Sequence, residues 1–270
     1  MSQCEDRYKE MASKGGGNRY RNNQKLFTAE FFASDATREV LRDKFKDKHR
    51  PVDLVSSQFV VHYSFESYEQ ADMFLRNASE SLKPDGYFIG TTTDASDIIR
   101  RVRLNNCRTI ENDVFSIEFE NDDILDVNKK VPLFGAKYHF KLDGVVDCPE
   151  FLLHFPTFVE MAEKHGLKLI LRERFEDYYS RVKETNEGKN TLKRMNVFEP
   201  YPDHKSQEKP PGEYEHAEEF LKRLPEDSRN RKIGTLSKSE WEAISVYLVF
   251  VFRKLSPRER YEQQAKRQKT

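Results

Sequence analysis

The chain of 270 residues has few cysteines, no excess charge and no long apolar run. Its three cysteines, Cys4, Cys107 and Cys148, are far apart and form no CxxC or Cys/His cluster, which argues against a disulfide framework and a cysteine-based zinc site. No apolar run approaches the ~20 residues of a membrane-spanning helix, and the amino terminus carries no signal-peptide pattern. We therefore predict a soluble protein of a reducing compartment, the cytosol or the nucleus.

Charged residues are abundant, but the two signs balance. Lysine plus arginine and aspartate plus glutamate each number 46, so the formal net charge is zero. A general nucleic-acid coat protein would be strongly basic, and that class is excluded. A protein that grips one short piece of nucleic acid in a local basic groove remains compatible with this balance.

The order of predicted elements in the first hundred residues indicates an α/β domain. Apolar stretches at 26–34, 53–61 and 87–92 predict strands, and the second is apolar enough to suggest burial on both faces. Helices are predicted at 36–44 and, from apolar residues at helical spacing, at 66–82. This alternation predicts right-handed crossovers and a doubly wound sheet.

The rest of the chain carries signals of mixed kind. An antiparallel pair is predicted within 114–142, and a helix over 150–165 opened by Pro149. Strands are predicted at 167–172 and 244–252. The second of these follows Ser237-Lys238-Ser239-Glu240, a capping-box pattern that marks the start of a helix.

We divide the chain into one domain and a tail. The domain spans 1–252 and includes an inserted helical lobe at about 183–236, where the sequence is polar and rich in proline, with a helix near 214–224. Residues 13–23 predict a flexible glycine-rich loop. The charged residues 253–270 predict a disordered tail.

Two strand ends carry residues suited to a ligand. In open α/β sheets, ligands lie at the carboxyl ends of the parallel strands. Asp35 ends one predicted strand, and its carboxylate can accept a hydrogen bond from an adenine amino group. The residues from Gln58 to Tyr63 end the next predicted strand. The rings of Phe59, His62 and Tyr63 can stack on a purine. Two plainer interpretations stay open: Asp35 caps the following helix, and the aromatic strand end belongs to the core.

Four long blocks resemble the eukaryotic mRNA cap guanine-N7 methyltransferases. They are QFVVHYSFESYEQADMFLRNASESLKPDGYFIGTT (58–92), PLFGAKYHFKLDGVVDCPEFLLHFP (132–156), LKRMNVFEPYP (192–202) and GTLSKSEWEAISVYLVFVF (234–252). The resemblance implies an incomplete class I, Rossmann-like sheet of the type that uses S-adenosylmethionine, with an inserted helical lobe. It also implies a nuclear protein that acts on the capped 5′ end of mRNA.

The resemblance implies which residues bind the methyl donor, S-adenosylmethionine. Asp35 matches the family position near the adenine, Gln58 a position that lines the donor, and Tyr63 one beside its methionine part. No metal is implied. The donor would carry the methyl group as a sulfonium.

The resemblance also implies residues for the cap. His62, Glu150 and Tyr247 match positions that contact the guanine, Arg7 matches a basic position associated with the cap phosphates, and Phe59 lies in the same motif. Physical roles are available for each kind: a carboxylate accepts from the guanine edge, a ring stacks on the base, and a guanidinium pairs with phosphate. On the residues alone, Glu150 could equally be a first-turn helix carboxylate, Tyr247 a core residue and Arg7 a surface cation.

The implied reaction needs no acid–base catalyst. The N7 atom of guanine has a free lone pair at neutral pH and can attack the sulfonium methyl in line. Alignment of the two reactants and a suitable electrostatic field would supply the rate. We therefore predict binding residues and no catalytic acid or base.

One family motif is absent from the sequence. The family carries a DxGxGxGG-like turn after its first strand, and Gly15-Gly16-Gly17 does not match it. We therefore expect a family member shortened at its amino end, with weak or absent donor binding.

Three functions remain in competition. The first is a cap guanine-N7 methyltransferase, and the second a non-enzymatic fragment that binds the cap or a partner. In vertebrate relatives the region matching 200–243 docks a small activating subunit. The third, a small-molecule methyltransferase, is disfavoured by the combination of Glu150 and Tyr247 with the His62–Phe65 run.

Overall fold

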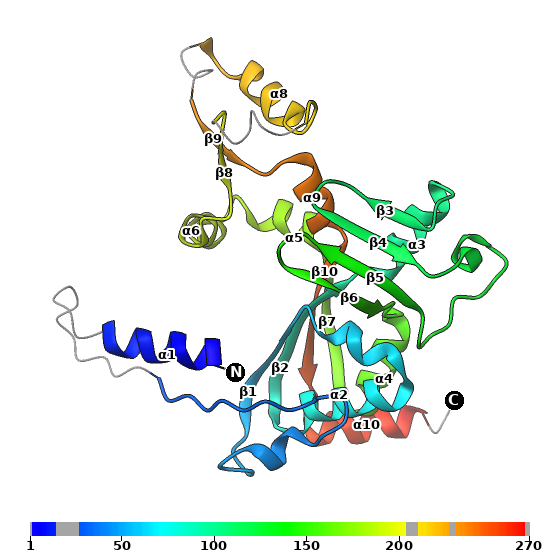
Figure 1. The fold of residues 1–270 in the computed structure, drawn as a ribbon. Helices are drawn as coiled ribbons and strands as arrows, with labels where there is room; N and C mark the ends of the chain where they lie inside the picture. Colours follow the sequence, from blue (N-terminus) through cyan, green and yellow to red (C-terminus); the bar gives the residue numbers. More distant parts are fainter. Residues whose placement is uncertain (1, 15–26, 204–209, 227–230, 268–270) are drawn as a thin grey trace.

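The fold is built on two four-stranded sheets (Figure 1). The structure is a computed structural model, and it describes residues 2–14, 27–203, 210–226 and 231–267. The first sheet contains, in spatial order, β1 (Val52–Gln58), β2 (Leu82–Thr93), β10 (Tyr247–Lys254) and β7 (Leu167–Arg174). Of the described strands, only β1 and β2 run parallel, joined through helix α2 (Tyr68–Glu80). This strand–helix–strand unit confirms the α/β class.

The second sheet is antiparallel throughout. Its strands are, in order, β3 (Thr109–Glu111), β4 (Phe115–Phe119), β5 (Lys137–Leu142) and β6 (Val146–Phe151). The antiparallel pair predicted within 114–142 is therefore confirmed as β4 and β5. The helix predicted over 150–165 is wrong at its start: Pro149 and Glu150 lie in β6, and helix α4 (Phe155–Lys164) begins later. Pro149 is tolerated because β6 is an edge strand, where a missing N–H costs no ladder bond.

Each sheet has its own hydrophobic core. α2 and α4 cover one face of the first sheet, where Leu75, Phe158 and Phe250 are at most 1% exposed. The second core lies between the antiparallel sheet, α3 (Ala95–Leu104) and α9 (Lys238–Ser245). Burial of this apolar surface is the main force that holds the layers together. The two cores meet where β2 ends and β10 begins.

Three local predictions are wrong. Residues 27–34 form no strand, and Phe27, Phe31 and Phe32 are exposed there; Leu26 lies outside the described residues. β1 is mostly exposed, with Leu54 at 52%, because β1 is an edge strand of the described sheet. The charged tail forms helix α10 (Pro257–Arg267), so the prediction of disorder fails for these residues.

The region of the predicted lobe carries small elements outside the two sheets. They are α6 (Asn186–Met195), β8 (Glu199–Tyr201), α8 (Glu215–Arg223) and β9 (Ile233–Thr235), and α5 (Phe175–Val182) directly precedes them. Figure 1 shows α6, α8, β8 and β9 projecting away from the two sheets. α8 confirms the helix predicted near 214–224, and α9 begins with the capping box predicted at Ser237 and Glu240.

The amino-terminal helix is α1 (Ser2–Lys14). It lies beyond β1, well separated from the antiparallel sheet in Figure 1. The ring of Tyr8 contacts the rings of Phe27 and Phe31 at centroid distances of 5.5 and 5.6 Å. The glycine-rich loop predicted at 13–23 lies outside the described residues from position 15 on. None of the described helices is long and apolar enough to cross a membrane.

Candidate functional site

The candidate site lies at the carboxyl ends of β1 and β2, where they meet the antiparallel sheet. β1 is followed by a short 3₁₀ helix, η2 (Val61–Glu66), which carries His62 and Tyr63. β6 brings Glu150 to the same place, and β10 begins there with Tyr247. Segments far apart in sequence therefore converge on one point, as expected for the ligand edge of an α/β sheet.

The carboxylate of Glu150 is the centre of the site, and it is only 3% exposed. The hydroxyl of Tyr63 donates to its Oε1 at 3.0 Å, and the hydroxyl of Tyr138 donates to its Oε2 at 2.7 Å. The Nε2 atom of His62 lies 3.2 Å from Oε1. We call these four residues the Glu150 cluster.

The Glu150 cluster keeps its carboxylate charged. Burial alone would raise the pKa of Glu150, but the contact with His62 and the hydrogen bonds from Tyr138 and Tyr63 outweigh it and lower this pKa below its usual value of 4.5. Burial, and then the negative charge of Glu150, raise the pKa of Tyr138 and that of Tyr247. The pKa of Tyr63 is raised by burial as well, so Tyr63 and Tyr138 remain neutral hydroxyl donors to one anion.

Two threonines at the end of β2 contact members of the Glu150 cluster. The hydroxyl of Thr92 lies 3.3 Å from Nδ1 of His62, and the hydroxyl of Thr93 lies 3.1 Å from that of Tyr138. The side chain of His62 is 1% exposed, yet its Nε2 has the distance but not the geometry of a hydrogen bond to Glu150. The His62 ring is thus held between Thr92 and the Glu150 carboxylate.

Aromatic rings form a wall next to the cluster. The ring of Phe59 contacts that of Tyr247 edge-on, at a centroid distance of 5.0 Å and an angle of 85°. Phe175 contacts both rings, at 6.1 Å from Phe59 and 5.7 Å from Tyr247. Phe59 has φ 57°, a left-handed conformation that is uncommon and costly for a large side chain. We call these three residues the aromatic wall.

The structure thus brings together five of the eight residues predicted for ligands. They are Phe59, His62, Tyr63, Glu150 and Tyr247. Glu150 lies on a strand, so its interpretation as a first-turn helix carboxylate is wrong. Tyr247 starts a strand and is only partly buried, with its ring against Phe59 and Phe175.

The other three predicted residues are used elsewhere. Asp35 is exposed, and its carboxylate accepts from the backbone N–H of Thr37 at 2.9 Å within a turn. The helix predicted at 36–44 is only a 3₁₀ turn at Leu41–Lys44 with Val40 at its cap, so the interpretation of Asp35 as a helix cap is wrong as well. The amide of Gln58 donates to the hydroxyl of Ser56 at 2.9 Å. Arg7 is exposed on α1, and no contact among the described residues joins it to the Glu150 cluster.

Sequence reasoning missed Tyr138 and Phe175. Tyr138 is the cross-strand partner of Glu150 in the register of β5 and β6. The alternation of buried and exposed residues in β5 places Tyr138 and Phe140 inward. Together with a strand at 146–151, this alternation would predict that Tyr138 lies opposite Glu150. No sequence signal distinguishes Phe175 from the other phenylalanines.

The arrangement can bind a flat, polar ring. An anionic carboxylate accepts N–H groups at the edge of such a ring, and the aromatic wall offers faces for stacking. Within the described part of the chain, no three His, Cys, Asp or Glu side chains gather as metal ligands. The site therefore offers hydrogen-bond acceptors and ring faces to a ligand.

Comparison with solved structures gives only a loose overlap. One of the most similar is the CcbJ methyltransferase of Streptomyces caelestis. The match covers 80% of this chain and 62% of that one at 15% identity, with a TM-score of 0.36.

Comparison at the level of sequence gives much closer matches. The chain is 45% identical to the mRNA cap guanine-N(7) methyltransferase of Drosophila melanogaster and 43% identical to that of Caenorhabditis elegans, over 94% of its length in each case. It spans 56% of the fly protein and 64% of the worm protein. The family model of the mRNA (guanine-N(7))-methyltransferase domain matches residues 1–255. The chain therefore belongs to the mRNA (guanine-N(7))-methyltransferase family.

Proposed function

We propose that the chain functions in methylation of the mRNA cap, in which a methyl group passes from S-adenosylmethionine to N7 of the cap guanine. The observation that carries the proposal is the Glu150 cluster, a buried anion beside a wall of rings. Guanine presents two kinds of N–H donor on its Watson–Crick edge, and a carboxylate is the side chain that accepts both. Relatives named for this activity cover nearly the whole chain.

The Glu150 carboxylate has lone pairs left to accept from such donors. A carboxylate offers about four lone-pair sites, and the two tyrosine hydroxyls occupy one on each oxygen. Because Glu150 is almost fully buried, the base must move a neighbouring side chain as it enters. Tyr63, which is only partly buried, is placed to give way. Guanine, once bound, would then supply a hydrogen-bond partner for Nε2 of His62.

The donor side is less well supported in this chain. S-adenosylmethionine would supply an activated methyl group, and Asp35, Gln58 and Tyr63 are the residues proposed to hold it. The first two have hydrogen-bond partners of their own and the third donates to Glu150. The alternative function is cap binding without methyl transfer. The capped 5′ end of mRNA, a nuclear location and an activating subunit on residues 200–243 belong to the proposal as well.

The proposal is tested by calorimetric titration with cap dinucleotides. We expect the chain to bind GpppG and to discriminate against ApppA, since adenine lacks the N–H donors that Glu150 accepts. Glu150→Gln should weaken binding of GpppG by about 10- to 100-fold, the cost of losing a hydrogen bond to a charged group. Asp147→Asn is the matched control, because Asp147 is exposed on the same strand and pairs with His139. Equal affinity for both dinucleotides, no affinity for GpppG, or an unaffected Glu150→Gln variant would each contradict the proposal.

A further inference from the structure

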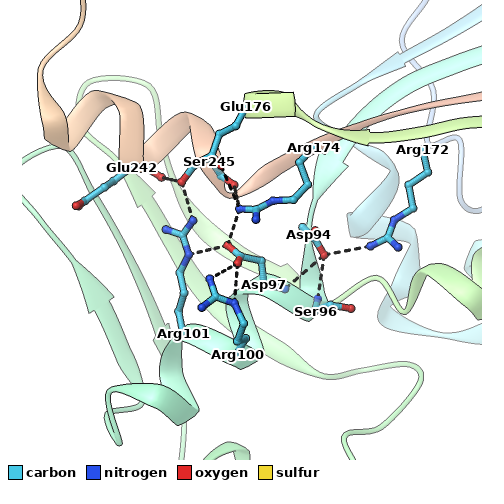
Figure 2. A network of polar contacts seen from close by, with 10 residues as sticks. All are labelled: Asp94, Ser96, Asp97, Arg100, Arg101, Arg172, Arg174, Glu176, Glu242 and Ser245. Atoms are coloured by element: carbon cyan, nitrogen blue, oxygen red, sulfur yellow. Dashed lines mark hydrogen bonds and ion pairs between the residues drawn. The ribbon is translucent and has the colours of Figure 1, made fainter. Parts of the chain in front are cut away.

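A network of charged and polar side chains gathers around the carboxylate of Asp97 (Figure 2). Helix α3 is capped by Asp94, whose side chain accepts from the backbone N–H groups of Ser96 and Asp97 at 3.2 and 3.4 Å. Asp97 follows in the first turn, and its side chain is 4% exposed. A carboxylate buried to this degree requires cationic partners, because its charge is costly to remove from water.

Three arginines from two elements surround Asp97. Arg100 and Arg101, on α3, place guanidinium nitrogens 2.6 Å from Oδ1 and Oδ2, respectively. Arg174, at the end of β7, lies 3.3 Å from Oδ2. Figure 2 shows the guanidinium groups converging on this one carboxylate.

Two of the three arginines continue to α9. Arg101 donates to the hydroxyl of Ser245 at 2.6 Å, and Arg174 donates to its carbonyl at 3.2 Å. Arg100 differs: its side chain is 58% exposed, and in the described part of the chain it makes no hydrogen bond or ion pair to α9 or β10. The Asp97 carboxylate therefore has two partners that also contact α9, Arg101 and Arg174, and one partner that does not, Arg100.

Ser245 lies two residues before a ring of the aromatic wall. Ser245 and Val246 lead directly into Tyr247, and the carbonyl of Val246 accepts from the backbone N–H of Asp94 at 2.7 Å. Asp94 in turn directly follows Thr93 on β2. The network thus holds together the two chain segments that present Tyr247 and the supporting threonines to the Glu150 cluster.

We infer that Asp97 and Arg101 are positioning residues for the candidate site, which fix the start of β10 and so the place of the Tyr247 ring. Neither side chain belongs to the Glu150 cluster or to the aromatic wall. Their action on a ligand would pass through Ser245 and the backbone that joins it to Tyr247. The ligand named in the test, GpppG, rests on the proposed function; the coupling to β10 does not.

The test compares two arginines that share one carboxylate. Arg101→Gln removes the ion pair with Asp97 and the hydrogen bond to Ser245, whereas Arg100→Gln removes only the ion pair. We expect Arg101→Gln to weaken binding of GpppG about tenfold, since small misplacement of a binding group is costly. Arg100→Gln should bind as the unchanged chain does. Ser245→Ala, which deletes only the hydroxyl, should weaken binding in the same direction and show non-additivity with Arg101→Gln.

A second readout needs no ligand. Hydrogen exchange at the Asp94 amide, which is bonded to Val246, should become faster in Arg101→Gln and stay unchanged in Arg100→Gln. Equal effects of the two arginine variants on exchange, or a loss of melting temperature in Arg101→Gln without faster exchange, would overturn the inference. If the unchanged chain binds no GpppG, the proposed function fails, and the exchange comparison still decides whether the network holds β10.

Discussion

Glu150 is a buried acid that stays ionised, so its effect on stability must depend on pH. Its pKa in the folded chain is lowered below the ordinary 4.5, because the contacts with His62, Tyr138 and Tyr63 outweigh burial. A lowered folded pKa means that the unfolded chain binds the proton more readily. The stabilisation by this carboxylate is therefore fully present above about pH 4.5 and is lost as the pH falls through the folded pKa.

Replacing this carboxylate should make the fold less sensitive to acid. We expect Glu150→Gln to be less stable than the unchanged chain at neutral pH, because the Tyr138 hydroxyl and His62 lose their anionic partner. The difference should shrink as the pH falls through the folded pKa of Glu150, since both chains then carry a neutral group at position 150. Urea unfolding across this range measures both effects. Asp147→Asn should run parallel to the unchanged chain; a constant gap between Glu150→Gln and the unchanged chain would contradict the assignment.

At the scale of the element, α10 shows how a local capping signal can prevail over a composition that predicts disorder. The segment is highly charged, which predicts disorder, but Ser256-Pro257-Arg258-Glu259 begins it with a capping box. The hydroxyl of Ser256 accepts from the N–H of Glu259 at 3.3 Å, and the Glu259 carboxylate accepts from the N–H of Ser256 at 2.9 Å. Pro257 occupies the first helical position, where its missing N–H costs nothing. The same pattern correctly predicted α9 from Ser237.

Removal of this cap should destabilise the chain measurably. We expect Ser256→Ala to lower the free energy of unfolding by about 1 kcal/mol, the usual cost of losing an N-cap hydroxyl. Ser180→Ala is the matched control, because Ser180 is exposed inside α5 and alanine favours a helix interior. Urea unfolding of both variants is the measurement. A Ser256→Ala variant as stable as the Ser180→Ala variant would show that the cap contributes nothing.

Other elements show why the local sequence pattern predicts some helices and strands correctly and misplaces others. The helix α2 was predictable because its apolar residues repeat at helical spacing and one face is buried. Pro149 suggests a helix start by local pattern but lies in an edge strand, since proline fits both positions. The exposed phenylalanines at 27, 31 and 32 resemble a strand in composition, but no strand lies beside them in the described sheet. Pairing partners are long-range information that local pattern lacks.

For the molecule as a whole, the residues predicted to bind the cap and those predicted to bind the methyl donor differ in how closely they lie together. Residues matched to the cap guanine converge from η2, β6 and β10 because two sheets meet there. The residues matched to the methyl donor do not converge on one point. The resemblance could not predict this, because it assigns residues to positions and says nothing about which other residues they contact in this chain. Asp35 lies in an exposed turn, Gln58 is exposed at the end of edge strand β1, and Tyr63 is held by Glu150.

This asymmetry predicts that the chain distinguishes its two ligands. We expect S-adenosylmethionine to bind with a Kd of about 1 mM or weaker, equivalent to no more than ~4 kcal/mol, because Asp35 and Gln58 would first have to exchange their own hydrogen bonds. Calorimetric titration measures this, with GpppG titrated into the same sample to show that the cap side is intact. Tyr63→Phe separates the two roles of Tyr63: loss of its bond to Glu150 should alter GpppG affinity and leave the donor titration flat. Donor binding at micromolar concentration would contradict the prediction and show that a donor pocket forms in this chain once the ligand is present.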